Sequence, residues 1–316
     1  MSWIEGSSPI SFPGLGIENW NPPRGFMIGD MPIYFYAIAI VTGLMLAVWY
    51  GCRRAKQFGL TEDDLIDGVI FIVPFAILCA RAYYCIFHGV GSFWEFFAIW
   101  NGGLAIYGGV IGAAIGIVVY AWIKRKKVKL TAVLDLTSLG FLIGQSLGRW
   151  GNFFNREAYG AETESFFRMG LKLTEDGRYS EFVRYWHPTF LYESVWNIGG
   201  FVLLHFLSKK RKYDGQIALG YVAWYGLGRT IIEGLRTDSL YWGPVRVSQL
   251  LAAASCFIAV VILVIMAFKR KDPQRLFVNV VAAREAAAAE QAAEEKEAVT
   301  DEMTADETAA EEQNEE

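Results

Sequence analysis

Polar side chains that could bind an anion interrupt an apolar helix between residues 140 and 160. The segment reads GFLIGQSLGRWGNFFNREAYG. If the helix continues, Arg149, Asn152 and Arg156 share one face, because spacings of three and four return to the same side. Ionisable groups at membrane depth are costly and usually serve a function. An anchored arginine among amides suits an anionic lipid headgroup; the alternative is a structural Arg–Glu pair within a helical bundle.

Small residues accompany this segment at regular intervals: Gly140, Gly144, Gly148 and Gly151. Such a stripe lets a neighbouring helix or a headgroup approach the backbone closely. Asn155, Glu157 and Gly160 follow where the helix is expected to break near the membrane surface. We therefore include them in the candidate site.

A second polar face is expected on a helix between residues 217 and 235. Four polar residues recur there at intervals of four, four and three: Tyr225, Arg229, Glu233 and Arg236. These intervals place them on one side of the helix, and Glu233 lies one turn from Arg229, where it can hold the guanidinium.

Arg149 and Arg229 are expected at matching depth on different helices. Two guanidinium groups so placed would clamp a phosphate, because each offers planar, paired donors and stays charged. Alternatively, each arginine is neutralised by a nearby glutamate, Glu157 or Glu233, and serves assembly only.

Further candidates begin other predicted spans on the same side. Tyr107 and Gly108 belong to the run NGGLAIYGG, whose glycines leave the tyrosine open to a cavity and backbone N–H groups free for an anion; the alternative is an interfacial tyrosine among flexible glycines. His187, followed by Pro188, could carry a proton, although a role in starting a helix is favoured. Tyr36 could line the same cavity or belong to an aromatic belt.

Composition indicates an all-α polytopic membrane protein. Of 316 residues, 53% are hydrophobic and 15% aromatic, and several apolar runs approach the length that crosses a bilayer. We expect seven spans, at about residues 33–50, 67–87, 104–123, 132–151, 189–207, 217–235 and 247–268. The aromatic stretch 93–100 is too short to cross and is expected to be interfacial or re-entrant.

Basic clusters follow the first, third, fifth and seventh spans: RRAK at 53–56, KRKKVK at 124–129, KKRK at 209–212 and KRK at 269–271. Short positively charged loops stay in the cytoplasm. The pattern predicts an external N-terminus, a cytoplasmic C-terminus, and a site towards the outer leaflet of the plasma membrane.

Three segments are expected to accompany the seven spans of the domain at residues 31–271. Residues 1–30, rich in Pro, Gly and Ser, should form an irregular interfacial segment. Residues 161–186, within that domain's range, should form a small extracytoplasmic cap, and residues 272–316 an acidic cytoplasmic tail. Residues 284–316 hold 13 acidic and two basic side chains, which leaves the rest of the chain at +7 and predicts a solvated, partly helical or disordered tail.

The four cysteines form no CxxC pair, and no His/Cys cluster has metal-ligand spacing. We expect neither a disulfide framework nor a metal site, and no cofactor or nucleic-acid partner. The N-terminus lacks the pattern of a cleaved signal peptide, so the first span is expected to be retained.

The segment from Gly148 to Gly160 resembles the signature G-R-x-G-N-F-x-N-x-E-x-x-G of the prolipoprotein diacylglyceryl transferases. The likeness extends over residues 30–270 through three further motifs: the glycines around Tyr107, HPTFLYE at 187–193, and GRTIIEGLR at 228–236. The resemblance implies a seven-span bacterial membrane enzyme. Such an enzyme moves the diacylglyceryl group of phosphatidylglycerol onto the lipobox cysteine in the signal peptide region of a preprolipoprotein, and releases glycerol phosphate.

Carried over by position, the resemblance assigns Arg149 and Arg229 to the donor phosphate. The same match assigns the remainder of the site to Asn152, Glu157, Tyr225, Glu233 and Arg236. Negative charge grows on a leaving phosphate ester when a thiolate attacks carbon, so two fixed guanidiniums would stabilise that transition state.

One position departs from the family pattern. Members often carry histidine where this chain has Tyr107, and tyrosine is a weak base because its reference pKa is near 10. The base is therefore left open among Tyr107, Glu157 and water, with Tyr107 expected to position substrate.

Two other functions remain open on sequence alone. A seven-span transporter of anionic solutes or lipids would also place arginines and glycines at depth, although no internal repeat of the transporter kind is visible. A lipid-binding structural protein without chemistry would use the same cluster.

Overall fold

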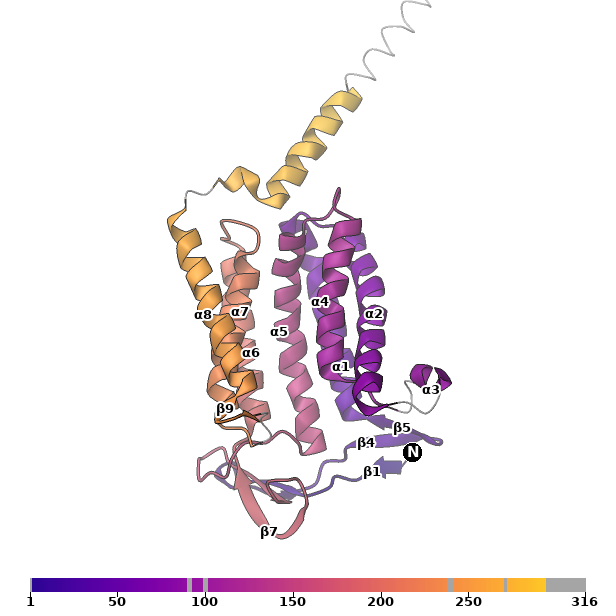
Figure 1. Ribbon diagram of the computed structural model, residues 1–316, viewed down its shortest axis with the longest axis vertical. Helices are drawn as coiled ribbons and strands as arrows, with labels where there is room; N and C mark the ends of the chain where they lie inside the picture. Colours follow the sequence, from indigo (N-terminus) through magenta and orange to yellow (C-terminus); the bar gives the residue numbers. More distant parts are fainter. Residues whose placement is uncertain (1, 90–92, 99–101, 238–240, 270–271, 294–316) are drawn as a thin grey trace, which may run out of the picture.

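Seven long helices run side by side in the computed structural model and carry a layer of short strands at one end (Figure 1). The structure describes residues 2–89, 93–98, 102–237, 241–269 and 272–293. The long helices are α1 Phe35–Arg54, α2 Glu62–His88, α4 Ile106–Ile123, α5 Leu130–Asn155, α6 Thr189–Ser208, α7 Gln216–Glu233 and α8 Val247–Phe268. Helix α3, Phe93–Phe97, is short. The all-α membrane fold is confirmed.

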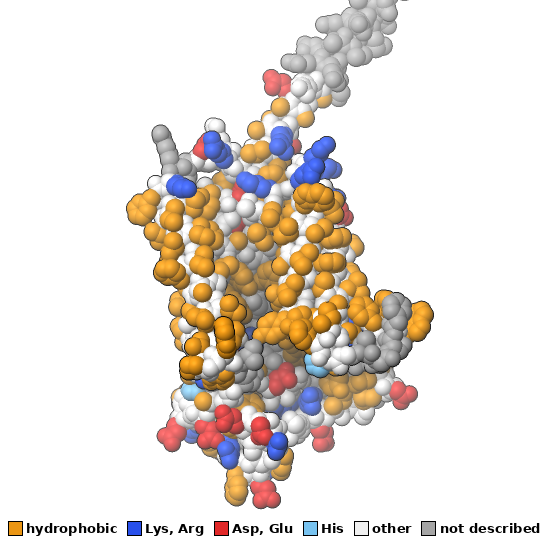
Figure 2. Space-filling view, in the orientation of Figure 1, with side chains coloured by type: hydrophobic (Ala, Val, Ile, Leu, Met, Phe, Trp, Pro, Cys, Tyr) orange, Lys and Arg blue, Asp and Glu red, His pale blue; other side chains and the backbone are white. Residues whose placement is uncertain are grey.

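Six of the described helices are long and apolar enough to cross a membrane: α1, α2, α4, α5, α6 and α8. Helix α7 is not among them. It carries Arg229 and Glu233 within 18 residues, which lowers its hydropathy, yet it packs alongside α6 and α8 in the bundle. Figure 2 shows hydrophobic side chains over much of the middle of the face in view, with charged side chains towards both ends.

The prediction that residues 1–30 are irregular is wrong. They contain β1 Ser2–Ile4, β2 Ile10–Phe12, β3 Ile17–Trp20 and β4 Gly25–Ile28, followed by β5 Met31–Tyr34. Strands β1, β4 and β5 form one antiparallel sheet, while β2 and β3 join β6 Met169–Leu173 and β7 Tyr179–Trp186 in the order β3-β2-β6-β7. Strands this short give little local signal in a sequence, because most of their stabilisation comes from distant partners.

The second sheet is seated on the ends of α5 and α6. Ile10 pairs with Leu171, and both side chains are fully buried. Trp186 is buried with them, in one cluster with Phe153 of α5 and Phe190 of α6. Since apolar burial is the main stabilising term in such packing, this cluster fixes the strand layer over the ends of the two helices that carry the candidate site.

Arg156 ties the N-terminal segment to α5 and is not on the face of Arg149. The helix ends at Asn155, and Arg156 adopts a left-handed conformation at φ 54° that turns its side chain away. Its buried guanidinium donates to the carbonyl oxygens of Ser8, Pro22 and Phe154. Burial, and secondarily the charge of Arg24, lowers the pKa of Arg156 to about 10, so it remains charged at neutral pH.

At the opposite end, a carboxylate in α5 caps the start of α7. Asp135 is fully buried and accepts backbone N–H groups from Gly215, Ile217 and Ala218 at 2.8–2.9 Å. Helix N-termini leave such donors without intrahelical partners. A negative charge there also interacts favourably with the positive end of the helix dipole. Asp135 therefore sets where α7 begins relative to α5.

We expect Asp135→Asn to lower the free energy of unfolding by about 2 kcal/mol, because an amide cannot accept all three bonds and brings no charge. Thermal unfolding in detergent would show a lower midpoint. Asp67→Asn is the matched control, since Asp67 forms an exposed pair with Lys124 at 2.9 Å and should change stability by less than about 1 kcal/mol.

The first turn of the C-terminal tail helix packs against the helical bundle. Residues 277–293 are helical. Phe277 is buried in the main helical core, and its N–H donates to Asp214 at 2.9 Å. Residues 282–293 are exposed, although Arg284 still donates to the carbonyl oxygen of Lys126 at 3.5 Å.

Candidate functional site

Three arginines converge on one buried carboxylate, that of Glu193 in the second turn of α6. Arg149 of α5 contacts its Oε2 through Nη2 at 2.5 Å. Arg229 of α7 and Arg236 after α7 contact its Oε1 through their Nη1 atoms at 3.3 and 3.5 Å. Arg229 also pairs with Glu233, with Nη2 and Oε2 2.5 Å apart. We call these five residues the arginine cluster.

The cluster is rich in guanidinium groups and is largely shielded from solvent. Its three guanidiniums surround the carboxylates of Glu193 and Glu233. Glu193 and Glu233 are buried, while the arginine side chains keep 10–23% of their surface exposed. Because water is scarce there, an arriving anion would interact with the guanidiniums more strongly than at an open surface.

An amide chain links the cluster to the strand layer. Arg149 donates from Nη1 to Oδ1 of Asn152 at 3.4 Å, and Asn152 donates from Nδ2 to Oε1 of Glu157 at 3.0 Å. Asn155 donates to the same Glu157 oxygen at 3.2 Å. Arg229 is thus paired with Glu233, as the alternative from sequence expected. Arg149 is paired with Glu193 and not with Glu157.

Two glycines allow the backbone contacts that assemble this site. A Cβ on Gly151 would lie 2.3 Å from the ring of Tyr36, so only glycine lets α1 bring that tyrosine against α5, within electrostatic range of Arg149 and Glu157. A Cβ on Gly160 would lie 2.7 Å from the carbonyl oxygen of Leu235. Gly160 forms a β-bridge with Arg236, and this close approach places that arginine beside Glu193.

His187 is held in a structural position. Its backbone carbonyl accepts from Gly160 at 2.9 Å, its N–H donates to Ala161, and its Nδ1 lies 3.3 Å from the hydroxyl of Tyr192. Burial lowers the pKa of His187 below its ordinary value of 6.5, so the ring is neutral at neutral pH. These contacts agree with the favoured role of His187 at the entry to α6.

Three predicted site residues make contacts outside the arginine cluster. Tyr225 stacks on Tyr221 with ring centroids 5.8 Å apart. Tyr107 on α4 is 64% exposed, with its ring 6.5 Å from that of Tyr83 on α2. Gly108 packs α4 onto α2, where a Cβ would lie 2.5 Å from the carbonyl oxygen of Cys79. Among the described residues, no hydrogen bond or ion pair joins Tyr107 to the cluster; Asn101, in the same motif, lies outside them.

Glu193 is not among the site residues predicted from the sequence. It belongs to the quoted motif at 187–193, but no oppositely charged residue lies within one helical turn of it in the sequence. Its partners come from α5, α7 and the turn after α7. A carboxylate inside an apolar span was nevertheless a usable signal, because such groups are costly unless paired.

The sequence is similar to those of proteins from one family. A family model described as prolipoprotein diacylglyceryl transferase matches residues 23–265. A phosphatidylglycerol–prolipoprotein diacylglyceryl transferase from Bacillus cereus strain B4264 is 41% identical over 249 residues, which cover 75% of this chain and 89% of that protein. One from Bacillus cytotoxicus is 40% identical over 258 residues, covering 78% and 92%. The chain therefore belongs to the prolipoprotein diacylglyceryl transferase family.

Proposed function

We propose that this protein transfers the diacylglyceryl group of phosphatidylglycerol to the thiol of the lipobox cysteine of a preprolipoprotein. Family membership supports this reaction. The structural observation that carries it is the convergence of Arg149, Arg229 and Arg236 around Glu193. A shielded group of three guanidiniums suits a phosphodiester, because each guanidinium offers paired donors to anionic oxygens.

In the proposed reaction the acceptor sulfur attacks the glycerol carbon that bears the phosphate. A carbon–sulfur bond forms, the carbon–oxygen bond to phosphate breaks, and the electron pair stays on the phosphate oxygen. Glycerol phosphate leaves, and the thiol proton passes to a base or to water. Charge grows on the departing phosphate, so guanidiniums that are already in position lower the barrier. Glu193 keeps them in position before the lipid arrives.

The hydrocarbon chains of the donor have a suitable cavity nearby. An apolar space of about 620 Å³ lies between α1, α2, α4 and α5, with Leu44, Phe141 and Gly144 in its lining. Gly144 precedes Arg149 by just over one helical turn. A lipid with its phosphate at Arg149 would therefore reach this cavity with its acyl chains.

We further propose that the strand layer faces outward and the basic end of the bundle faces the cytoplasm of a bacterial cell. This assignment counts α7 as the seventh span. It places the basic clusters 53–56, 124–129 and 209–212, together with Lys269, on one side, in agreement with the distribution of positive charge in membrane proteins. In this orientation the arginine cluster lies below the outer surface.

Tyr107→Phe is expected to leave the transfer rate within about threefold of the original, because Tyr107 is exposed and makes no polar contact with the cluster among the described residues. The measurement is kcat for transfer by the original protein and the variant, determined over a range of pH. If the phenylalanine variant were inactive while Tyr107→His was active with a displaced pH profile, Tyr107 would be the proton acceptor instead.

The function itself is tested with purified protein, phosphatidylglycerol and a lipobox peptide. If the protein is the transferase, the peptide gains the mass of one diacylglyceryl unit on its cysteine. No gain, together with solute flux into liposomes, would support the transporter. No gain and no flux, with lipid retained, would support a binding protein.

A further inference from the structure

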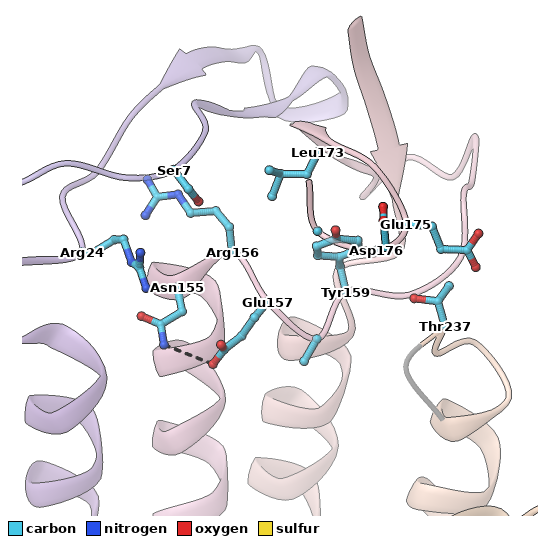
Figure 3. Close-up of a pocket in the computed structure, with 12 residues that line it drawn as sticks. Ser7, Arg24, Asn155, Arg156, Glu157, Tyr159, Leu173, Glu175, Asp176 and Thr237 are labelled. Carbon is cyan, nitrogen blue, oxygen red and sulfur yellow. Dashed lines mark hydrogen bonds between the residues drawn. The ribbon is translucent and has the colours of Figure 1, made fainter. Parts of the chain in front are cut away.

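A cleft of about 890 Å³, lined largely by polar residues, opens on the strand side of the molecule (Figure 3). Four separate segments enclose it: the N-terminal segment, the turn after α5, the β6–β7 hairpin and the chain after α7. Tyr159 fixes one wall by donating its hydroxyl to the carbonyl of Thr174 at 2.6 Å. The buried Arg156 fixes another by its bonds to the N-terminal segment. The cleft is therefore a built feature of the strand layer.

The cleft shares residues with the proposed site. Glu157 and Asn155 line it, and the Glu157 oxygen that accepts from Asn155 also accepts from Asn152, which is bonded to Arg149. A molecule that reacts beside Arg149 thus has a direct polar path into the cleft.

The walls offer hydrogen-bonding atoms that the protein does not use. The Nε–H of Arg24 and the Oδ1 of Asn155 are buried and lack hydrogen-bond partners within the described parts of the chain. Figure 3 shows the two side chains together on one side, with Glu175 and Asp176 across the cleft. One free donor and one free acceptor are what a peptide unit requires, since each residue presents one C=O and one N–H.

The size of the cleft also favours a chain over a small molecule. Its volume lies towards the upper end of the range of about 300–1,000 Å³ found for ligand sites and far exceeds a glycerol phosphate. An extended polypeptide advances about 3.3 Å per residue, so several residues fit.

We propose that this cleft binds the polar segment of the acceptor polypeptide that directly follows its cysteine. The inference rests on the proposed function: with the cysteine at the arginine cluster and the preceding apolar segment in the membrane, the following residues leave on the strand side. Arg24 and Asn155 bond the backbone of that segment, and Glu175 and Asp176 favour uncharged or basic side chains.

The test compares two acceptor peptides that share a lipobox and end either one or eight residues after the cysteine. Arg24→Gln is expected to raise KM for the long peptide about tenfold, and to leave its kcat, and both constants of the short peptide, unchanged. Glu175→Gln, an exposed change on the opposite wall, is expected to raise KM for a long peptide carrying lysine and not for an uncharged one. Arg184→Gln is the matched control, because Arg184 forms an exposed pair with Glu162 in the same layer. It should leave KM unchanged for both peptides.

Several outcomes would overturn the proposal. Equal KM values for the two peptides with the unaltered protein would show that the cleft adds nothing to acceptor binding. If Arg24→Gln changed inhibition by glycerol phosphate and left the long-peptide KM unchanged, the cleft would serve the leaving group. Loss of kcat on both peptides would place Arg24 in the reaction itself. Failure of the unaltered protein to modify either peptide would instead reject the proposed transfer.

Discussion

Arg149→Lys is expected to reduce kcat for diacylglyceryl transfer by about 100-fold or more, the usual effect of removing one fixed donor to a developing charge. Arg149 reaches Glu193 with one terminal nitrogen and Asn152 with the other. Lysine keeps the positive charge but has a single flexible ammonium, which cannot make both contacts and also meet a phosphate oxygen. Arg229→Lys should behave alike, because Arg229 bridges Glu193 and Glu233.

The measurement is transfer to a lipobox peptide, with kcat and the KM for phosphatidylglycerol determined separately. Because the interaction strengthens as charge develops, the loss should appear mainly in kcat. Arg53→Lys, at the basic end of α1 where Arg53 lies over the ring of Trp49, is the matched control and should retain full activity. A lysine variant at position 149 with unchanged kcat would remove Arg149 from the mechanism.

Glu193→Gln is expected to destabilise the protein by about 3 kcal/mol as well as to impair transfer. Breaking a buried ion pair on one side leaves uncompensated charge behind, and here one carboxylate serves three guanidiniums. The variant cluster would have one negative charge fewer beside its three guanidiniums. We therefore also expect an anionic lipid to restore more of the thermal stability of the variant than of the original protein.

Thermal unfolding in detergent, with and without phosphatidylglycerol, checks this expectation, with phosphatidylcholine as the uncharged comparison. Glu162→Gln is the control, since Glu162 forms an exposed pair with Arg184 at 3.0 Å and should cost less than about 1 kcal/mol. Unchanged stability of Glu193→Gln would mean that the arginines are neutralised by other groups.

The helices could be predicted from sequence because hydropathy is a local property. The predicted span 189–207 corresponds to α6 at Thr189–Ser208, and the predicted span 247–268 to α8 at Val247–Phe268. The strands could not be predicted in this way, since β2 has only three residues and pairs with β6 far along the chain. The amino-acid composition of such short strands resembles that of irregular segments.

The candidate site was predicted where helical spacing determines it. Tyr225, Arg229 and Glu233 lie on α7 as expected, and Arg149 and Arg229 come together. The role of Glu193 depends on contacts between helices, which spacing within one helix does not reveal. Arg156 was misplaced because the left-handed turn after Asn155 ends the periodicity on which the prediction depended.

The pairing of Ile10 with Leu171 has a consequence for biogenesis. The first thirty residues leave the ribosome early, yet β6, the partner of β2, is made only after α5 is complete, so the sheet β3-β2-β6-β7 is assembled late. Because distant pairings form slowly, the newly made protein should pass through a stage with its helices inserted and its strand layer still open. The cleft is complete only when that layer closes, so we expect competence for acceptor modification to appear after membrane insertion, as a separate and later event.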